Sequence, residues 1–214
     1  MSRGRVLVLV GIASALTRIA VQADPSARVD ELPWDVTVPR GAVREIDFTT
    51  DEGTWMSVDI SPDGRWVLFD LLGHIYRVPS SGGDAELLTG ESGIALNFHP
   101  RYSPDGRTIA FISDRGGQNN LWIMSADGSR PKALFLDDAM CVVEPVWLTD
   151  GSAIVVRRQR TCHRGNWSSA GLWAYPLGGG TPRELVKESE QAAGWPSVSA
   201  DGASLYYHYA VCPG

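Results

Sequence analysis

The sequence predicts an all-β fold, and within that class a β-propeller built from four-stranded antiparallel blades. A Ser-Pro-Asp-Gly tetrapeptide recurs in two full and two weaker copies, at intervals of 42, 45 and 51 residues. Each copy is followed by runs of β-branched and aromatic residues, which are typical of strands. Four short strands in every ~40–50 residues, without a long helical pattern between them, indicate propeller blades.

The first 23 residues have the pattern of a signal peptide. Arg3 and Arg5 precede an apolar stretch at 6–16, and residues 21–23 place small side chains at a cleavage site. The apolar stretch is too short to span a membrane, and cleavage after Ala23 would release a periplasmic or secreted protein. An ordinary N-terminal helix is the alternative. We assign residues 24–42 to a linker and 43–214 to the propeller.

The strands are expected in a constant order after each tetrapeptide. The second strand of each blade is predicted at 66–69, 109–112, 154–156 and 205–207, and the third at 75–78, 121–124 and 172–175. Glycine-rich turns and short outer strands that end near Leu88, Leu134 and Leu185 complete the unit. Because these runs are apolar on both faces, we expect neighbouring blades to cover both faces of each sheet.

The repeat count predicts an incomplete ring, with three full blades and part of a fourth that stops near Val211. Residues 43–48 resemble an outer strand but precede the first tetrapeptide, as though they belonged to a last blade that this chain does not contain. The alternative is a four-bladed ring that this strand closes, because propellers have ~4–8 blades.

The aspartates of the repeated tetrapeptide are predicted to be structural. Ser, Pro and Gly at the first, second and fourth positions are typical of a type I turn, and a carboxylate at the third can accept backbone N–H groups. Every blade needs the same corner, whereas a binding residue would be expected in one blade only. The four turn aspartates are Asp63, Asp105, Asp150 and Asp201.

Polar side chains on the innermost strands are the candidate binding residues. Counting back from each turn aspartate, positions 3 and 5 are apolar, whereas positions 4 and 6 are largely polar and share one face of the strand. Innermost strands line the central channel of a propeller. A ligand or partner segment could meet Asp59, His99, Arg101 and Glu144 there. The alternative is that these residues form salt bridges and hydrogen bonds between blades.

Charge and cysteine content narrow the possible partners. The net charge of −6 disfavours nucleic-acid binding, which depends on a basic surface, and no apolar run is long enough for a transmembrane helix. Export would place the chain in an oxidising compartment, where Cys141 and Cys162 could form a disulfide and leave Cys212. Three buried thiols are the alternative, and an odd count does not decide between them.

The sequence carries no complete catalytic set. The four histidines are isolated from one another, so that neither a His-x-His nor a His-Glu-x-x-His metal site occurs. The sequence also lacks the Gly-x-Ser-x-Gly motif of a serine hydrolase. We therefore expect no metal, no other cofactor and no intrinsic catalysis in residues 24–214.

The repeat resembles that of TolB-type propellers. The resemblance rests on Ser-Pro-Asp-Gly followed by Ile-Ala-Phe-Ile-Ser-Asp-Arg at 109–115 and Asn-Leu-Trp-Ile-Met-Ser-Ala-Asp-Gly at 120–128. The stretches 51–57 and 69–76 are similar to the N-terminal propeller of exported bacterial proteins whose C-terminal half is an amidohydrolase. The third repeat departs from the pattern, with Thr149 in place of proline and an enlarged loop at 157–170.

The resemblance implies a non-catalytic propeller that scaffolds an amidohydrolase-like hydrolase or screens access to it. Its partner would be a C-terminal catalytic domain, which would hold any metal. Two alternatives share the turn motif. One is a free-standing TolB-like module that binds a protein or peptide, and the other is the gating propeller of a secreted serine peptidase.

Overall fold

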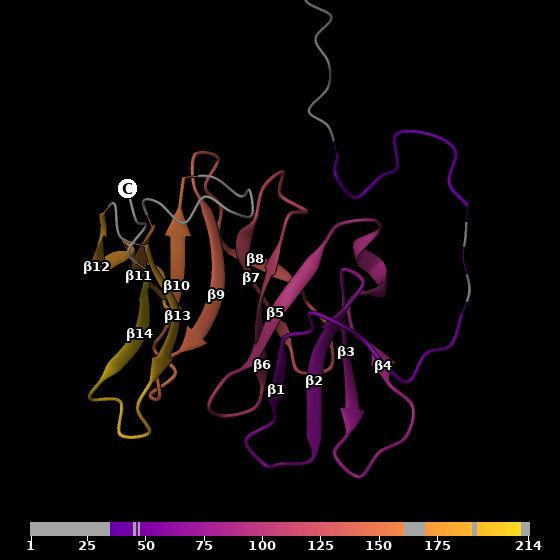
Figure 1. The fold of residues 1–214 in the computed structure, drawn as a ribbon, viewed down its shortest axis with the longest axis horizontal. Helices are drawn as coiled ribbons and strands as arrows, with labels where there is room; N and C mark the ends of the chain where they lie inside the picture. Colours follow the sequence, from indigo (N-terminus) through magenta and orange to yellow (C-terminus); the bar gives the residue numbers. More distant parts are fainter. Residues whose placement is uncertain (1–34, 45, 47, 161–169, 190–191, 211–214) are drawn as a thin grey trace, which may run out of the picture. The chain divides into compact units, whose positions relative to one another are not determined.

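The computed structural model describes residues 35–44, 46, 48–160, 170–189 and 192–210, which contain fourteen β-strands and one short 3-10 helix. The chain divides into two units, Met1–Pro33 and Trp34–Gly214, and every described residue belongs to the second. Its strands form antiparallel sheets that follow one another along the chain (Figure 1). This architecture confirms the all-β propeller fold.

Each sheet is one blade, and its strands pair in chain order. Blade 1 consists of β1 (Val58–Ile60), β2 (Trp66–Leu71), β3 (His74–Pro79) and β4 (Glu86–Leu87). Blade 2 follows the 3-10 helix η1 (Gly90–Ser92) and consists of β5 (Asn97–Tyr102), β6 (Thr108–Ser113), β7 (Asn120–Ser125) and β8 (Lys132–Phe135). Blade 3 consists of β9 (Cys141–Trp147), β10 (Ala153–Gln159), β11 (Ala170–Pro176) and β12 (Arg183–Ser189). In the described residues blade 4 has two strands, β13 (Ala192–Val198) and β14 (Leu205–Ala210).

The corner between the first and second strands has the same geometry in every blade. In blade 1 the Gly64 N–H donates to the Ser61 carbonyl at 2.7 Å. The closing glycines have φ of 70° or 71°, a left-handed conformation that glycine adopts without the steric cost of a Cβ atom. These glycines are Gly64, Gly106, Gly151 and Gly202. The required φ explains why glycine ends each tetrapeptide.

The hydrophobic core lies between blades. One cluster, which includes Leu68 and Phe111, joins blade 1 to blade 2, and a second, which includes Ile112 and Val156, joins blade 2 to blade 3. A third cluster around Val155 joins blade 3 to blade 4. Nearly all side chains of β6 and β10 are buried, because each of these strands has a neighbouring blade on both faces.

Other predicted features lie outside the sheets or outside the described residues. The segment 43–48 was expected to form a strand, but its described residues, Val43, Arg44, Ile46 and Phe48, are exposed and form none. The signal peptide at 1–23 and positions 161–169 of the enlarged loop are outside the described residues. No helix in the described part is long and apolar enough to cross a membrane.

Candidate functional site

The innermost strands of blades 2, 3 and 4 share a β-bulge that the sequence analysis did not predict. Pairing with the second strand shifts register in β5, β9 and β13. At the shift lies a residue with positive φ, namely His99 (52°), Glu144 (57°) or Trp195 (46°), and a proline follows it in each case. An extra residue in one strand leaves its backbone groups outside the regular ladder, so the N–H of each bulge residue needs another acceptor.

That acceptor is in each case a side chain of the preceding blade. The His99 N–H donates to Asp70 Oδ2 at 2.6 Å, and the Glu144 N–H donates to His99 Nδ1 at 3.2 Å. The Trp195 N–H donates to Glu144 Oε2 at 2.6 Å. We call these three hydrogen bonds the bulge latches. They link four blades in succession, and His99 and Glu144 each donate through the backbone and accept through the side chain.

Asp70 is a functional residue of this network that sequence reasoning missed. Its side chain is buried in β2, and besides the His99 N–H its carboxylate accepts the Ser57 N–H at 2.8 Å. One carboxylate therefore links Ser57, which directly precedes β1, to the innermost strand of blade 2. The sequence does contain a signal for this role, since Asp70 is an acidic residue in an otherwise apolar run. A carboxylate that is buried with such a strand requires hydrogen-bond partners.

Glu144 is paired with a second charge that was also not predicted. Arg157 of β10 places Nη1 at 3.4 Å from Glu144 Oε1, and the two side chains are only 7% and 10% exposed. Gly194 leaves room for this pair, since a Cβ atom there would lie 3.2 Å from Glu144 Oε2. The pair is thus enclosed between blades 3 and 4.

The remaining two candidate residues also make contacts between blades. Asp59 Oδ2 accepts the Tyr102 N–H at 2.7 Å, across blades 1 and 2. Arg101 Nη1 donates to the Pro100 carbonyl at 2.7 Å and to the Val58 carbonyl at 3.4 Å. The Arg101 carbonyl accepts Trp147 Nε1 of blade 3 at 3.1 Å. All four candidates thus make the inter-blade bonds of the alternative interpretation, and a role in binding a ligand stays a prediction.

The turn aspartates act as local acceptors. Asp63 Oδ1 accepts the Ser61 hydroxyl at 2.6 Å and the Arg65 N–H at 3.1 Å. These hydrogen bonds, the hydroxyl first, lower the pKa of Asp63 to about 2. Asp105 and Asp201 have the same arrangement with Ser103 and Ser199, and their pKa values are lowered for the same reason.

In the third repeat the turn aspartate is also a local acceptor, but its hydroxyl donor is a different residue. Leu148 occupies the position of the turn serine. The Ser152 N–H donates to Asp150 at 2.9 Å, as the equivalent N–H does in the other turns, and the Ser152 hydroxyl replaces that of the missing serine at 2.7 Å. The backbone bond, followed by the hydroxyl bond, lowers the pKa of Asp150. The departure in the sequence therefore does not change the function of the aspartate.

Among the described residues, no group of three His, Cys, Asp or Glu side chains is arranged to hold a metal ion. Cys141, at the start of β9, is disulfide-bonded. Cys162, its predicted partner, lies outside the described residues.

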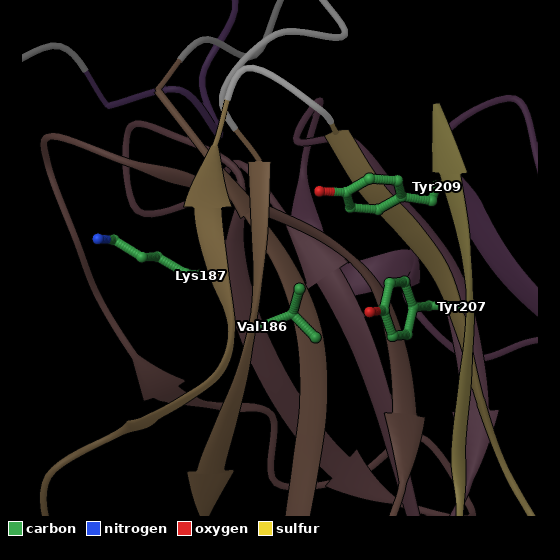
Figure 2. A pocket seen from close by; sticks show the side chains of 4 residues that line it. All are labelled: Val186, Lys187, Tyr207 and Tyr209. Atoms are coloured by element: carbon green, nitrogen blue, oxygen red, sulfur yellow. The ribbon is translucent and has the colours of Figure 1, made fainter. Parts of the chain in front are cut away.

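An open hollow of about 500 Å³ lies between β12 of blade 3 and β14 of blade 4. Its lining residues are Val186, Lys187, Tyr207 and Tyr209. Figure 2 shows the two tyrosine rings and Val186 directed toward the hollow, whereas the Lys187 ammonium group points away from it. Among the described residues, the lining is largely aromatic and does not contain the convergent polar groups of a catalytic site.

Comparison with known proteins supports a propeller of the TolB type. No protein-family model matches the chain. A stretch of 77 residues, 36% of this chain and 11% of the relative, is 50% identical to the uncharacterized peptidase YuxL of Bacillus subtilis. A stretch of 46 residues, 22% of this chain and 10% of the relative, is 50% identical to the Tol-Pal system protein TolB of Anaeromyxobacter dehalogenans. The matched part is therefore about a tenth of the length of either relative.

Solved structures show the same fold. TolB from Acinetobacter baumannii has a TM-score of 0.56 and 26% identity, over 73% of this chain and 38% of the other. A puromycin hydrolase has a TM-score of 0.53 over 70% of this chain and 24% of the other, and at 18% identity it supports the fold alone. In fold, this chain is a TolB-like β-propeller.

Proposed function

We propose that this propeller is the non-catalytic module of an exported hydrolase, in which it scaffolds a catalytic domain or screens access to it. The observation that carries the proposal is the 50% identity over 77 residues to a peptidase many times longer than the matched stretch. The candidate residues of the innermost strands support it as well, because their hydrogen bonds hold blades together.

Two kinds of catalytic domain are candidates. The stretches 51–57 and 69–76 favour an amidohydrolase-like domain, which would hold its own metal ion. The match to a peptidase favours a serine peptidase, with this chain as its gating propeller. A free-standing TolB-like module that binds a protein or peptide is the third candidate, favoured by the 46 residues that match TolB.

The coding sequence downstream of codon 214 separates these candidates. Codons for His-x-His would support the amidohydrolase, codons for Gly-x-Ser-x-Gly would support the peptidase, and a stop codon would support the free-standing module. If a catalytic domain is found, its activity on small and large substrates should be compared with and without the propeller. A screening propeller should slow large substrates selectively, and equal rates for both sizes would contradict that role.

The purified protein itself should not hydrolyse esters, peptides or cyclic amides. The reason is that the sequence lacks the metal-ligand and nucleophile sets of the related enzymes. Turnover that a metal chelator or a serine-directed inhibitor abolishes would contradict a non-catalytic module.

We also propose that the protein is periplasmic or secreted. The N-terminal pattern of 1–23 and the disulfide at Cys141 both support export to an oxidising compartment. N-terminal sequencing of the protein from a cell envelope or medium fraction should begin at Asp24. Recovery of the uncleaved chain from the cytoplasm would contradict this localisation.

A further inference from the structure

The three bulge latches differ from one another in the chemistry of the acceptor. Asp70 and Glu144 accept through a carboxylate, whereas His99 accepts through an imidazole nitrogen, with Nδ1 at 3.2 Å from the Glu144 nitrogen. Carboxyl side chains ordinarily gain a proton near about pH 4, and histidine near about pH 6.5. The latch between blades 2 and 3 is therefore the one whose acceptor titrates close to neutral pH.

Protonation of the His99 ring removes the acceptor completely. A neutral imidazole has one nitrogen with a free lone pair, and an imidazolium has none, because both nitrogens then carry a proton. Rotation of the ring does not restore the bond, since either nitrogen would direct its own N–H at the Glu144 N–H. The residue is half-buried, so that part of it is accessible to the solvent from which the proton comes.

The backbone of Glu144 depends on this hydrogen bond. Its φ of 57° lies in a region that is unfavourable for a residue with a Cβ atom, and such conformations persist where the surroundings hold them. The ladder between β9 and β10 shifts register at this point, between Val155 and Arg157. Loss of His99 as an acceptor thus leaves the Glu144 N–H without this bond and releases a strained conformation in β9.

Acidic and basic side chains are mixed on the elements packed against β5, which are β1, β2, β3, β6 and β9. Asp59 of β1, Asp70 of β2 and Glu144 of β9 each already accept a backbone N–H, and β6 carries no charged side chain. The other ionisable groups, from β3, β10 and β5 itself, are His74, Tyr76, Arg77, Arg157, Arg101 and Tyr102. A charge on His99 therefore does not meet one sign alone, and the specific effect of protonation is the loss of an acceptor.

We propose that protonation of His99 opens the latch between blades 2 and 3, so that this junction of the propeller responds to pH between about 5 and about 7. The blades stay together through the hydrophobic cluster that includes Ile112 and Val156. The change is therefore a local loosening of β9 around Glu144 and not a separation of blades. This inference is independent of the proposed function.

Hydrogen exchange of the latched amides tests the proposal, when it is followed by NMR and expressed as protection relative to an unstructured chain. We expect the protection of the Glu144 amide to fall about tenfold between about pH 7.5 and about pH 5.5, the factor by which one ordinary hydrogen bond shifts a local opening equilibrium. The His99 amide, which donates to the Asp70 carboxylate, is the internal reference and should keep its protection.

A variant with an acceptor that does not titrate separates this effect from general acid sensitivity. In His99→Asn, the amide oxygen replaces Nδ1 as an acceptor and stays an acceptor at every pH of the experiment. The protection of the Glu144 amide should then not depend on pH. His74→Asn is the matched control, because it changes a half-buried histidine of blade 1, and it should retain the pH response of the wild type.

The NMR signals of the His99 ring nitrogens keep the test informative if the variants do not fold. In the wild type, Nδ1 should carry no proton at about pH 8 and should gain one over the same pH range in which the Glu144 amide loses protection. Constant protection of that amide, or a ring that gains its proton while the amide stays protected, would overturn the proposal. A response that persists in His99→Asn or disappears in His74→Asn would overturn it as well.

Discussion

A histidine and two carboxylates serve the same purpose in successive blades, although their chemistry differs. Asp70, His99 and Glu144 each accept one backbone N–H from the innermost strand of the next blade. The requirement at these positions is an acceptor of the right length rather than a particular residue. In His99 the acceptor is Nδ1, so a neutral ring carries its proton on Nε2.

Removal of one acceptor should destabilise the fold. We expect Glu144→Ala to lower the free energy of unfolding by about 3 kcal/mol, because it removes the buried carboxylate that pairs with Arg157 and accepts the Trp195 N–H. Glu144→Gln retains an oxygen that can accept that N–H, so its free energy of unfolding should fall by less. Urea unfolding followed by tryptophan fluorescence measures both. Glu52→Ala, at an exposed position, is the control, and a Glu144→Ala midpoint equal to that of the control would contradict the latch.

The turn aspartates permit a second test of single residues. Asp105→Ala should cost about 1–2 kcal/mol, the usual consequence of losing a side chain that accepts local backbone donors. Its carboxylate accepts the Ser103 hydroxyl and the Arg107 N–H. Thermal melts of Asp105→Ala and of Asp84→Ala, which changes an exposed aspartate outside the turns, make the comparison. Equal melting temperatures for the two variants would show that the turn does not depend on the carboxylate.

Among the strands, the regular repeats were predictable from the sequence, whereas the bulges that interrupt the innermost strands were not predicted. The recurring tetrapeptide and the apolar runs placed the second and third strands of blades 1 to 3 within a few residues. The bulges were missed although a proline follows His99, Glu144 and Trp195 and prolines within sheets are confined to edges, strand starts and bulges. None of the three residues is a glycine, which would have indicated positive φ directly. The conformation at these residues depends on acceptors in another blade, about 30 to 50 residues earlier in the chain, and local pattern does not carry that information.

The disulfide of Cys141 should stabilise the first strand of blade 3. Cys141 is 1% exposed and begins β9, the strand that carries Glu144. We expect Cys141→Ser to lower the free energy of unfolding by about 2–4 kcal/mol, as for loss of a native disulfide. Denaturant unfolding with and without reductant measures this. Reductant should lower the free energy of unfolding of the wild type but not that of the variant. An equal free energy of unfolding for the wild type with and without reductant, even when the reductant is added to the unfolded protein, would contradict the prediction.

At the scale of the molecule, acid should destabilise the protein because every blade repeats the same turn. The pKa of Asp63 is lowered to about 2, and those of Asp105, Asp150 and Asp201 are lowered as well. A carboxyl group with a lower pKa in the folded than in the unfolded state stabilises the fold above its unfolded pKa of ~3.9. That contribution disappears as the pH falls through the folded value.

We therefore expect the melting temperature to fall between about pH 4 and about pH 2. Calorimetry over that range measures it, and Asp63→Asn should flatten the decline because one of the four groups no longer titrates. A melting temperature that stays constant down to about pH 2 would show that the turn aspartates do not contribute through their charge.

The whole-molecule fold was more predictable than the site. Four copies of one turn and the apolar strands between them were sufficient for the propeller, since each blade must cover its neighbour. The prediction of the candidate site relied on alternate positions of the innermost strands, which place Asp59, His99, Arg101 and Glu144 on the same face. It lacked Asp70 and Arg157, because both lie on second strands and the prediction considered the innermost strands alone. Asp70 reaches His99 of the next blade, and Arg157 reaches Glu144 from the neighbouring strand of the same sheet.

The direction of the bulge latches has a consequence for synthesis on the ribosome. Each acceptor precedes its donor in the chain: Asp70 serves blade 2, His99 serves blade 3 and Glu144 serves blade 4. Chains emerge N-terminus first at ~5–20 residues per second, and early segments fold before later ones are made. Every bulge residue is therefore translated after the side chain that accepts its N–H, so that this acceptor has already left the exit tunnel when the bulge emerges.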